Sequence, residues 1–189
     1  MSYPQSDPER DQFYVWIGHC ITAWARLENH LFEVLWRCLQ CPQDRAAIVY
    51  YKTPSIDPRL TLTDELVRAA LPKAENGAQP HPDLKTWSAI YNEIKAQLAT
   101  RRRIAHQPVR LGKETFSLAP DEHFGENEIE LTYYEIHFSE NEALRGKASE
   151  PLHINDLVDH DQAVTRLALL LQRFEKGALS NHAPKPPGR

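Results

Sequence analysis

Apolar residues recur at alternating steps of four and three over residues 7–40. This spacing places them on a single stripe of an α-helix. Asp7 followed by Pro8 is typical of a helix start, and Pro42 predicts the end. Such a helix of roughly 30 residues and ~45 Å is long enough to form the spine of a bundle. The stripe contains Phe13, Ile17, Cys20, Trp24, Leu27, Leu31, Val34 and Cys38.

Further apolar patterns with a helical period predict a mainly α-helical fold. A short helix is expected over 43–52, where Pro54 limits it, and a second over 57–71, opened by Asp57 and Pro58. A helix from 82 or 83 runs to 106 and ends before Pro108, and a last one closes at Gly177. We expect one helical-bundle domain over residues 1–177 and a disordered tail over 178–189.

Residues from about 115 to 138 depart from the helical pattern. The segment EIELTYYEIHF is rich in β-branched and aromatic residues that alternate with polar ones, as in a strand. The segment ETFSLA can pair with it across PDEHFGENE, whose proline and glycine favour a turn. The sequence therefore predicts a small β-hairpin inserted after the fourth helix.

Composition narrows the class of protein. The 189 residues are 41% apolar and 25% charged, as in globular domains, and a net charge of −4 argues against polyanion binding by the whole surface. We find no signal-like start and no apolar run that could cross a membrane. The odd number of cysteines, three, lacks the spacing of a disulfide framework. We therefore expect reduced thiols and a cytoplasmic location.

Charge is distributed unevenly along the second half of the chain. Residues 101–113 hold five basic and no acidic residues, whereas residues 121–142 hold eight acidic residues and neither lysine nor arginine. Any nucleic-acid site should therefore lie in the basic cluster. We expect the hairpin's glutamates to lie on its outer face, where they would protect an exposed edge and repel RNA.

Several reaction chemistries lack their motifs. The chain has no glycine-rich phosphate loop and no serine in a nucleophile-elbow context. Its nine histidines form no His-Glu-x-x-His motif and no Glu-x-x-His pairs on facing helices, so we predict no metal site and no cofactor.

The segment RRRIAH at residues 101–106 remains as the candidate for chemistry. Helical phase places Arg101 and Arg102 on either side of the apolar stripe and points Arg103 into solvent. A purely structural interpretation is also open. In that case His106 would interact with the helix dipole, and Arg101 would form an ion pair with Glu28.

These residues resemble the HEPN superfamily. The resemblance rests on WARLENHLFEVL in the long helix, on RRRIAH at a helix end, and on INDLVDHDQAVTRLALLLQRF in the last helix. The family signature is an arginine, often a polar residue, two to four further residues and a histidine. Arg101 and His106 match it, whereas Arg102 stands where asparagine is common and Gln107 where glycine is common. The similarity covers roughly residues 10–107 and 153–176.

The resemblance implies a compact helical bundle and leaves two functions open. One is a metal-independent endoribonuclease of defence or toxin type, controlled by an antitoxin or another regulatory protein. In it, Arg101 and His106 would be catalytic at the cleft of a homodimer, supported by Arg102, Glu28 and Arg110. The other is a non-catalytic module for dimerisation or for nucleotide or protein binding. The basic cluster favours the first function, and the acidic hairpin favours the second.

Overall fold

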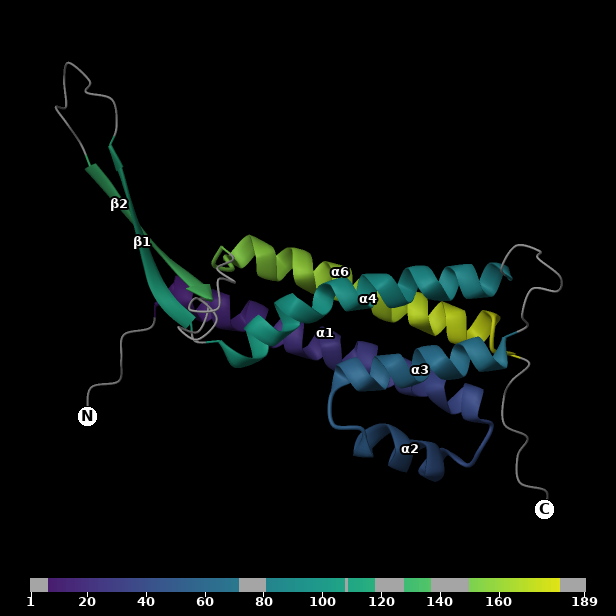
Figure 1. The fold of residues 1–189 in the computed structure, drawn as a ribbon. Helices are drawn as coiled ribbons and strands as arrows, with labels where there is room; N and C mark the ends of the chain where they lie inside the picture. Colours follow the sequence, from purple (N-terminus) through teal and green to yellow (C-terminus); the bar gives the residue numbers. More distant parts are fainter. Residues whose placement is uncertain (1–6, 72–80, 108, 118–127, 137–149, 181–189) are drawn as a thin grey trace. The chain divides into compact units, whose positions relative to one another are not determined.

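The computed structural model describes residues 7–71, 81–107, 109–117, 128–136 and 150–180. Within these residues the fold is mainly helical with one two-stranded antiparallel sheet, as predicted (Figure 1). None of the helices described is long and apolar enough to span a membrane. The elements in chain order are α1 (Pro8–Leu39), α2 (Gln43–Lys52), α3 (Ile56–Ala70), α4 (Pro82–His106), β1 (Val109–Ser117), β2 (Glu128–Ile136) and α6 (Ile154–Gly177).

The cap at the start of α1 has the predicted chemistry, whereas the start of α3 differs from the prediction. The Asp7 carboxylate accepts hydrogen bonds from the backbone N–H of Glu9 at 3.1 Å and of Arg10 at 3.4 Å. Those two N–H groups would otherwise lack a helical partner. Helix α3 begins at Ile56, so Asp57 lies inside its first turn rather than at its cap. A carboxylate there still interacts favourably with the helix dipole.

The chain divides into two compact units, which we describe separately. The first contains residues 1–20 and 100–159, and the second contains residues 21–99 and 160–189. Each unit has its own apolar core.

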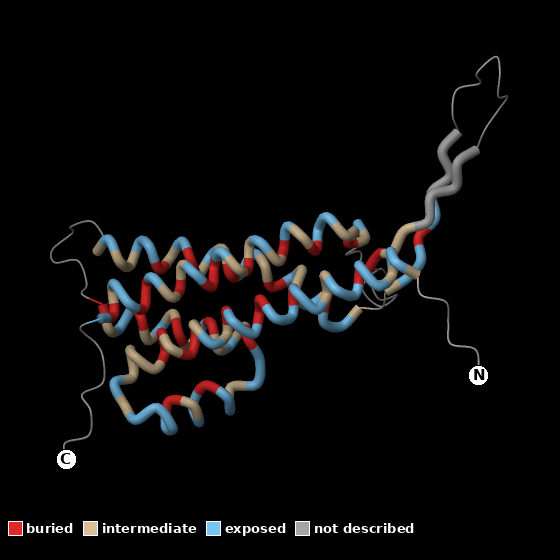
Figure 2. The backbone as a smooth tube through the Cα atoms, turned by 180° about the vertical axis from the view of Figure 1, so that it is seen from behind, coloured by how far each residue is buried: buried red, intermediate tan, exposed pale blue. Residues whose placement is uncertain are grey.

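The second unit is a helical bundle. Its parts of α1, α3, α4 and α6 lie side by side, and α2 packs on the outside against α1 (Figure 1). The buried stripes of these helices face inward, while their outer faces are exposed (Figure 2). The largest fully buried side chains of this core are Leu27, Leu31, Leu35, Tyr50, Leu60, Trp87, Ile94, Leu167 and Leu171.

A neutral polar network lies inside this bundle. Trp24 Nε1 donates to His160 Nε2 at 2.8 Å, and His160 Nδ1 lies 2.7 Å from Gln97 Oε1. His160 is 3% exposed, and burial lowers its pKa to about 4. Because Nε2 accepts a hydrogen bond from the indole N–H, the ring proton belongs on Nδ1, which donates to Gln97. His160 lies within α6, six residues after its first residue, Ile154.

The first unit combines the start of α1, the end of α4, the hairpin and the start of α6. Leu152 adds to the sheet through two backbone bonds with Ile136, of 3.0 and 3.1 Å. Cys20 Sγ donates to the carbonyl oxygen of Leu157 at 3.3 Å, which joins α1 to α6 within this unit. The apolar core of the unit consists of Phe13, Cys20, Ile104, Ile136, Leu152 and Leu157.

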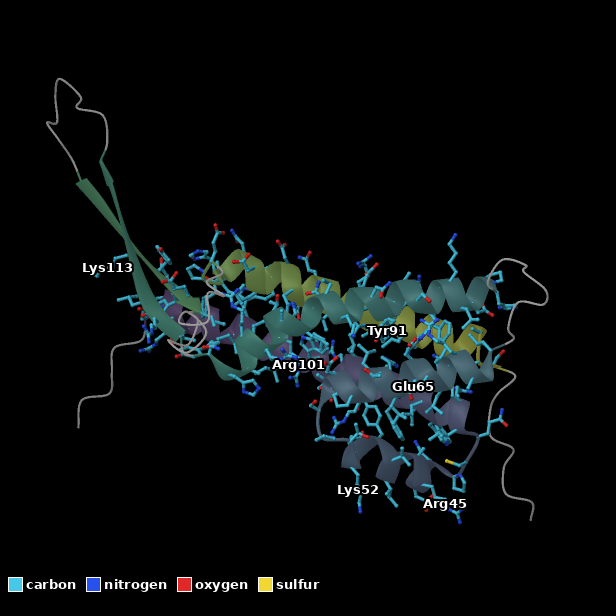
Figure 3. All side chains as sticks on the ribbon, viewed as in Figure 1. Arg45, Lys52, Glu65, Tyr91, Arg101 and Lys113 are labelled. Atoms are coloured by element: carbon cyan, nitrogen blue, oxygen red, sulfur yellow. The ribbon has the colours of Figure 1, made fainter. Side chains whose placement is uncertain are left out.

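The hairpin is longer than the sequence predicted. Strand β1 begins at Val109, directly after Pro108, rather than near residue 115, so it includes Arg110 and Lys113 of the basic cluster. Lys113 is labelled on β1 in Figure 3. The register pairs Arg110 with Glu135, which places a basic residue opposite an acidic one. Glu135 is only 4% exposed, so our prediction that it lies on the outer face is wrong. The predicted hairpin turn lies outside the described residues.

The C-terminal segment is ordered further than expected. We predicted a disordered tail from residue 178, but Leu179 is fully buried in the core of the second unit. The hydroxyl of Ser180 donates to the carbonyl oxygen of Gly177 at 2.9 Å. The rest of the predicted tail lies outside the described residues.

Candidate functional site

The RRRIAH segment forms the end of α4, within the first unit. Ile104 is 7% exposed and anchors this turn in the core. Around it, Arg101 is partly buried, whereas Arg102 and His106 are exposed. Arg101 lies on α4 as labelled in Figure 3. Among the described residues, the His106 imidazole has no hydrogen-bond or ion-pair partner, so both ring nitrogens are accessible to a ligand.

Helical geometry places these three side chains unequally. Arg102 and His106 are four residues apart, which puts them on the same side of α4, about 40° apart. Arg101 and His106 are five residues apart, which separates them by about 140° around the helix axis. The immediate neighbour of His106 within one chain is therefore Arg102, at the variable position of the motif.

Arg103 does not point into solvent as predicted. Its Nη2 donates to the carbonyl oxygen of Glu150 at 2.6 Å and to that of Ile136 at 3.3 Å. The side of α4 opposite its own apolar stripe is covered here by the end of β2 and by Glu150. Arg103 is therefore a structural residue that fastens the hairpin to α4.

Arg103→Ala should lower the free energy of unfolding by about 1–2 kcal/mol, because two backbone carbonyls lose a charged donor. Chemical denaturation followed by circular dichroism would measure this loss. Arg102→Ala is the matched control, since it removes an exposed arginine from the same turn. Equal stability of the two variants would show that the Arg103 contacts contribute nothing.

Glu28 occupies a structural position in the second unit. Its Oε2 accepts a hydrogen bond from Arg59 Nη1 at 3.0 Å, and its carbonyl oxygen accepts one from the Tyr50 hydroxyl at 3.1 Å. The Arg59 guanidinium also stacks over the Tyr50 ring, 5.0 Å from its centre. These contacts join α1, α2 and α3, a role that the sequence did not indicate. Arg110, the other proposed supporting residue, is exposed on β1.

The cysteines at the end of α1 and the potential metal ligands of the described residues are weaker candidates for a reactive site than the sequence suggests. We predicted from the sequence that the chain has no Cys-x-x-Cys pair, which is wrong, because Cys38 and Cys41 have this spacing at the end of α1. Burial raises the pKa of the Cys38 thiol to about 12, so it is protonated at neutral pH and a poor nucleophile or metal ligand. Within the described ranges, no three His, Cys, Asp or Glu side chains are arranged to hold a metal ion.

Comparisons of the chain with protein-family models, curated proteins and solved structures give no match. The candidate site is therefore interpreted from its own residues. It combines an accessible imidazole with two accessible or partly accessible guanidinium groups on one helix end. Such a group of side chains can move protons and stabilise negative charge on phosphate oxygens.

Proposed function

We propose that this protein is a HEPN-like, metal-independent endoribonuclease that acts as a homodimer. The observation that supports this proposal most directly is the exposed His106, with Arg101 and Arg102 on the same helix end. Buried Ile104 fixes the backbone of that end, so the three side chains project from a rigid support.

The proposed reaction is an attack by the ribose 2′-oxygen on the adjacent phosphorus. His106 removes the 2′-hydroxyl proton as general base, and an imidazolium protonates the departing 5′-oxygen. The P–O5′ bond breaks as the P–O2′ bond forms, which leaves a 2′,3′-cyclic phosphate and a free 5′-hydroxyl. Arg101 stabilises the negative charge that develops on the non-bridging oxygens.

The geometry of α4 supports the proposal of a homodimer. Since Arg101 and His106 diverge by about 140° around the helix, one chain does not direct both at the same phosphate. Two copies whose α4 ends face each other can combine the Arg101 of one with the His106 of the other. We infer a composite cleft of this kind.

An exposed apolar face on α1 supports an interface with a second copy. Tyr14 and Val15 are 52% and 55% exposed, although both are large apolar residues. Gly18 follows one turn later, and a Cβ added there would meet no other atom. A glycine inside a helix costs stability relative to alanine. Its presence at this open position is explained if the helix of a second copy packs closely over it.

Gly18→Gln separates the stability of the monomer from dimerisation. The substitution should stabilise α1 by about 0.5–1 kcal/mol, because glutamine favours a helix and meets no obstacle. It should also weaken the dimer at least about tenfold by obstructing the close contact. Sedimentation equilibrium measures the association. The control is Ala69→Gln, which changes an exposed residue of α3. A monomeric wild-type protein at micromolar concentration would contradict the composite site.

Cleavage of RNA in the presence of excess EDTA tests the function itself. A labelled single-stranded RNA should yield fragments that end in a 2′,3′-cyclic phosphate, which mass spectrometry distinguishes from a 3′-hydroxyl. Cleavage that stops when metal is chelated would contradict the mechanism. A dimer that binds RNA or a protein without cleaving would favour the non-catalytic interaction module instead, which the exposed face of α1 also suits.

A further inference from the structure

A small cavity of about 200 Å³ lies in the first unit, and neither Arg101 nor His106 is among its lining residues. Its volume is below that of most drug-sized ligand sites, so it suits a group of only a few heavy atoms. Three elements meet around it: the start of α1, β2, and the start of α6. The lining residues are Glu9, Gln12, Phe13, Tyr133, Tyr134, His153 and Ile154.

One aromatic wall of the cavity is fixed by hydrogen bonding. The Tyr134 hydroxyl donates to Asp7 Oδ2 at 2.5 Å, and its ring lies 6.4 Å from the ring of Phe13. This bond lowers the pKa of Asp7 and raises that of Tyr134, so the proton stays on the phenol. Donation to a carboxylate increases the electron density of the Tyr134 ring, which strengthens its attraction for a cation.

A second aromatic residue of the lining, Tyr133, is fixed by packing. The Tyr133 and His153 rings make an edge-on contact with centres 5.1 Å apart. Gly112 on β1 makes room for Tyr133, because a Cβ at that position would lie 2.6 Å from the tyrosine ring. The His153 backbone N–H donates to Asp156 Oδ2 at 2.8 Å, which holds the start of α6. The aromatic groups are therefore in place before any ligand binds.

The charge around the cavity is negative. Glu9 lines it with a carboxylate that, among the described residues, has no hydrogen-bond or ion-pair partner. Asp7 accepts from the Tyr134 hydroxyl and Asp156 from the His153 backbone N–H, so both carboxylates lie next to lining residues. Among the described residues that line the cavity none is a lysine or arginine, and nearby Arg10 forms an ion pair with Asp11. A phosphate or carboxylate ligand would be repelled here, whereas a cation would be attracted.

We propose that this cavity binds a small quaternary ammonium compound, with Tyr133 and Tyr134 as the aromatic walls and Glu9 as the counter-charge. Aromatic faces attract a cation that carries methyl groups, because its charge is diffuse and its desolvation costs little. A carboxylate at the rim adds attraction without the directional hydrogen bonds that a primary amine would require. This site does not depend on the ribonuclease function proposed above.

Titration with choline tests the proposal, with 3,3-dimethylbutan-1-ol as a neutral compound of the same shape. Calorimetry at constant ionic strength should show choline binding at least about tenfold more tightly than the alcohol. Glu9→Gln should weaken choline binding about three- to fivefold, whereas Glu65→Gln, an exposed glutamate on α3, should leave it unchanged. Tyr133→Leu should weaken choline binding at least about fivefold.

The outcomes distinguish this proposal from the proposed ribonuclease. Equal affinity for choline and the neutral alcohol would overturn cation recognition, and so would the absence of choline binding to the folded wild-type protein. Glu9→Gln changes an exposed residue, so it tests the charge even if Tyr133→Leu does not fold. His106→Ala should bind choline as the wild type does, whether or not the wild type cleaves RNA.

Discussion

His106→Ala is expected to reduce RNA cleavage by at least about 10²-fold while leaving the fold and the dimer intact. The loss follows from removing the group that moves the 2′-hydroxyl proton. Arg101→Ala should cause a loss of similar size, because the phosphorane oxygens lose a fixed positive charge. Initial rates on a labelled RNA, measured at equal dimer concentrations, would give both ratios.

A matched variant on α1 controls for general effects of charge. Arg26→Ala removes an exposed arginine without touching α4, so it should cleave at the wild-type rate. Arg102→Ala tests the neighbour of His106 and should show whether the variable position contributes. Wild-type cleavage by His106→Ala would refute the catalytic role, and RRRIAH would then be a structural helix end.

Acidification is expected to destabilise the protein through His160. Burial lowers the folded-state pKa of this histidine from its ordinary value of 6.5 to about 4. Both hydrogen-bond partners, Trp24 and Gln97, are neutral, and the Trp24 N–H points at Nε2, where a second proton would have to bind. The folded chain therefore resists protonation here, while the unfolded chain accepts it.

The pH range of this effect follows from the two pKa values. Above about pH 6.5 both states are neutral at His160, and the full stability is present. Between pH 6.5 and about 4 only the unfolded state gains the proton, so stability falls with pH by a total of about 3 kcal/mol. Urea unfolding at about pH 7.5, 6.5, 5.5 and 4.5 would follow the loss.

His160→Gln separates this effect from the titration of carboxylates. A glutamine can still accept from Trp24 and donate to Gln97 but has no proton to gain in this range. The difference in unfolding free energy between wild type and variant should therefore shrink as the pH falls. A difference that stays constant from pH 7.5 to 4.5 would show that His160 does not resist protonation.

The helices were predictable because each carries a long apolar stripe with clear ends. Along the α1 stripe every predicted position is buried except Ile17 and Cys38, which are partly exposed. His160 was missed although it occupies a stripe position of α6, three residues after Leu157 and four before Val164. Periodicity shows that a position faces the core. It does not show which residues of other helices form hydrogen bonds with a buried imidazole.

The candidate site was less predictable, because helical phase describes one helix at a time. Arg103 lies opposite the stripe of α4, yet the end of β2 and Glu150 cover it. The strand around Gly112 was missed because glycine is rare in strands. A glycine is needed there because the Tyr133 ring, on the paired strand, occupies the space of a Cβ. The resemblance to the HEPN superfamily and the roles of Arg101 and His106 remain predictions.

The bond between Cys20 and Leu157 has a consequence for how the chain folds during synthesis. The two residues are 137 positions apart in the sequence. The first unit combines residues 1–20 with residues 100–159, so its two parts are synthesised at different times. At about 5–20 residues per second, a ribosome needs roughly 7–27 s to make the intervening chain. Cys20 must wait that long for Leu157, and Phe13 waits only slightly less long for Tyr134. The N-terminal segment is therefore the part of the nascent protein that most needs protection by a chaperone.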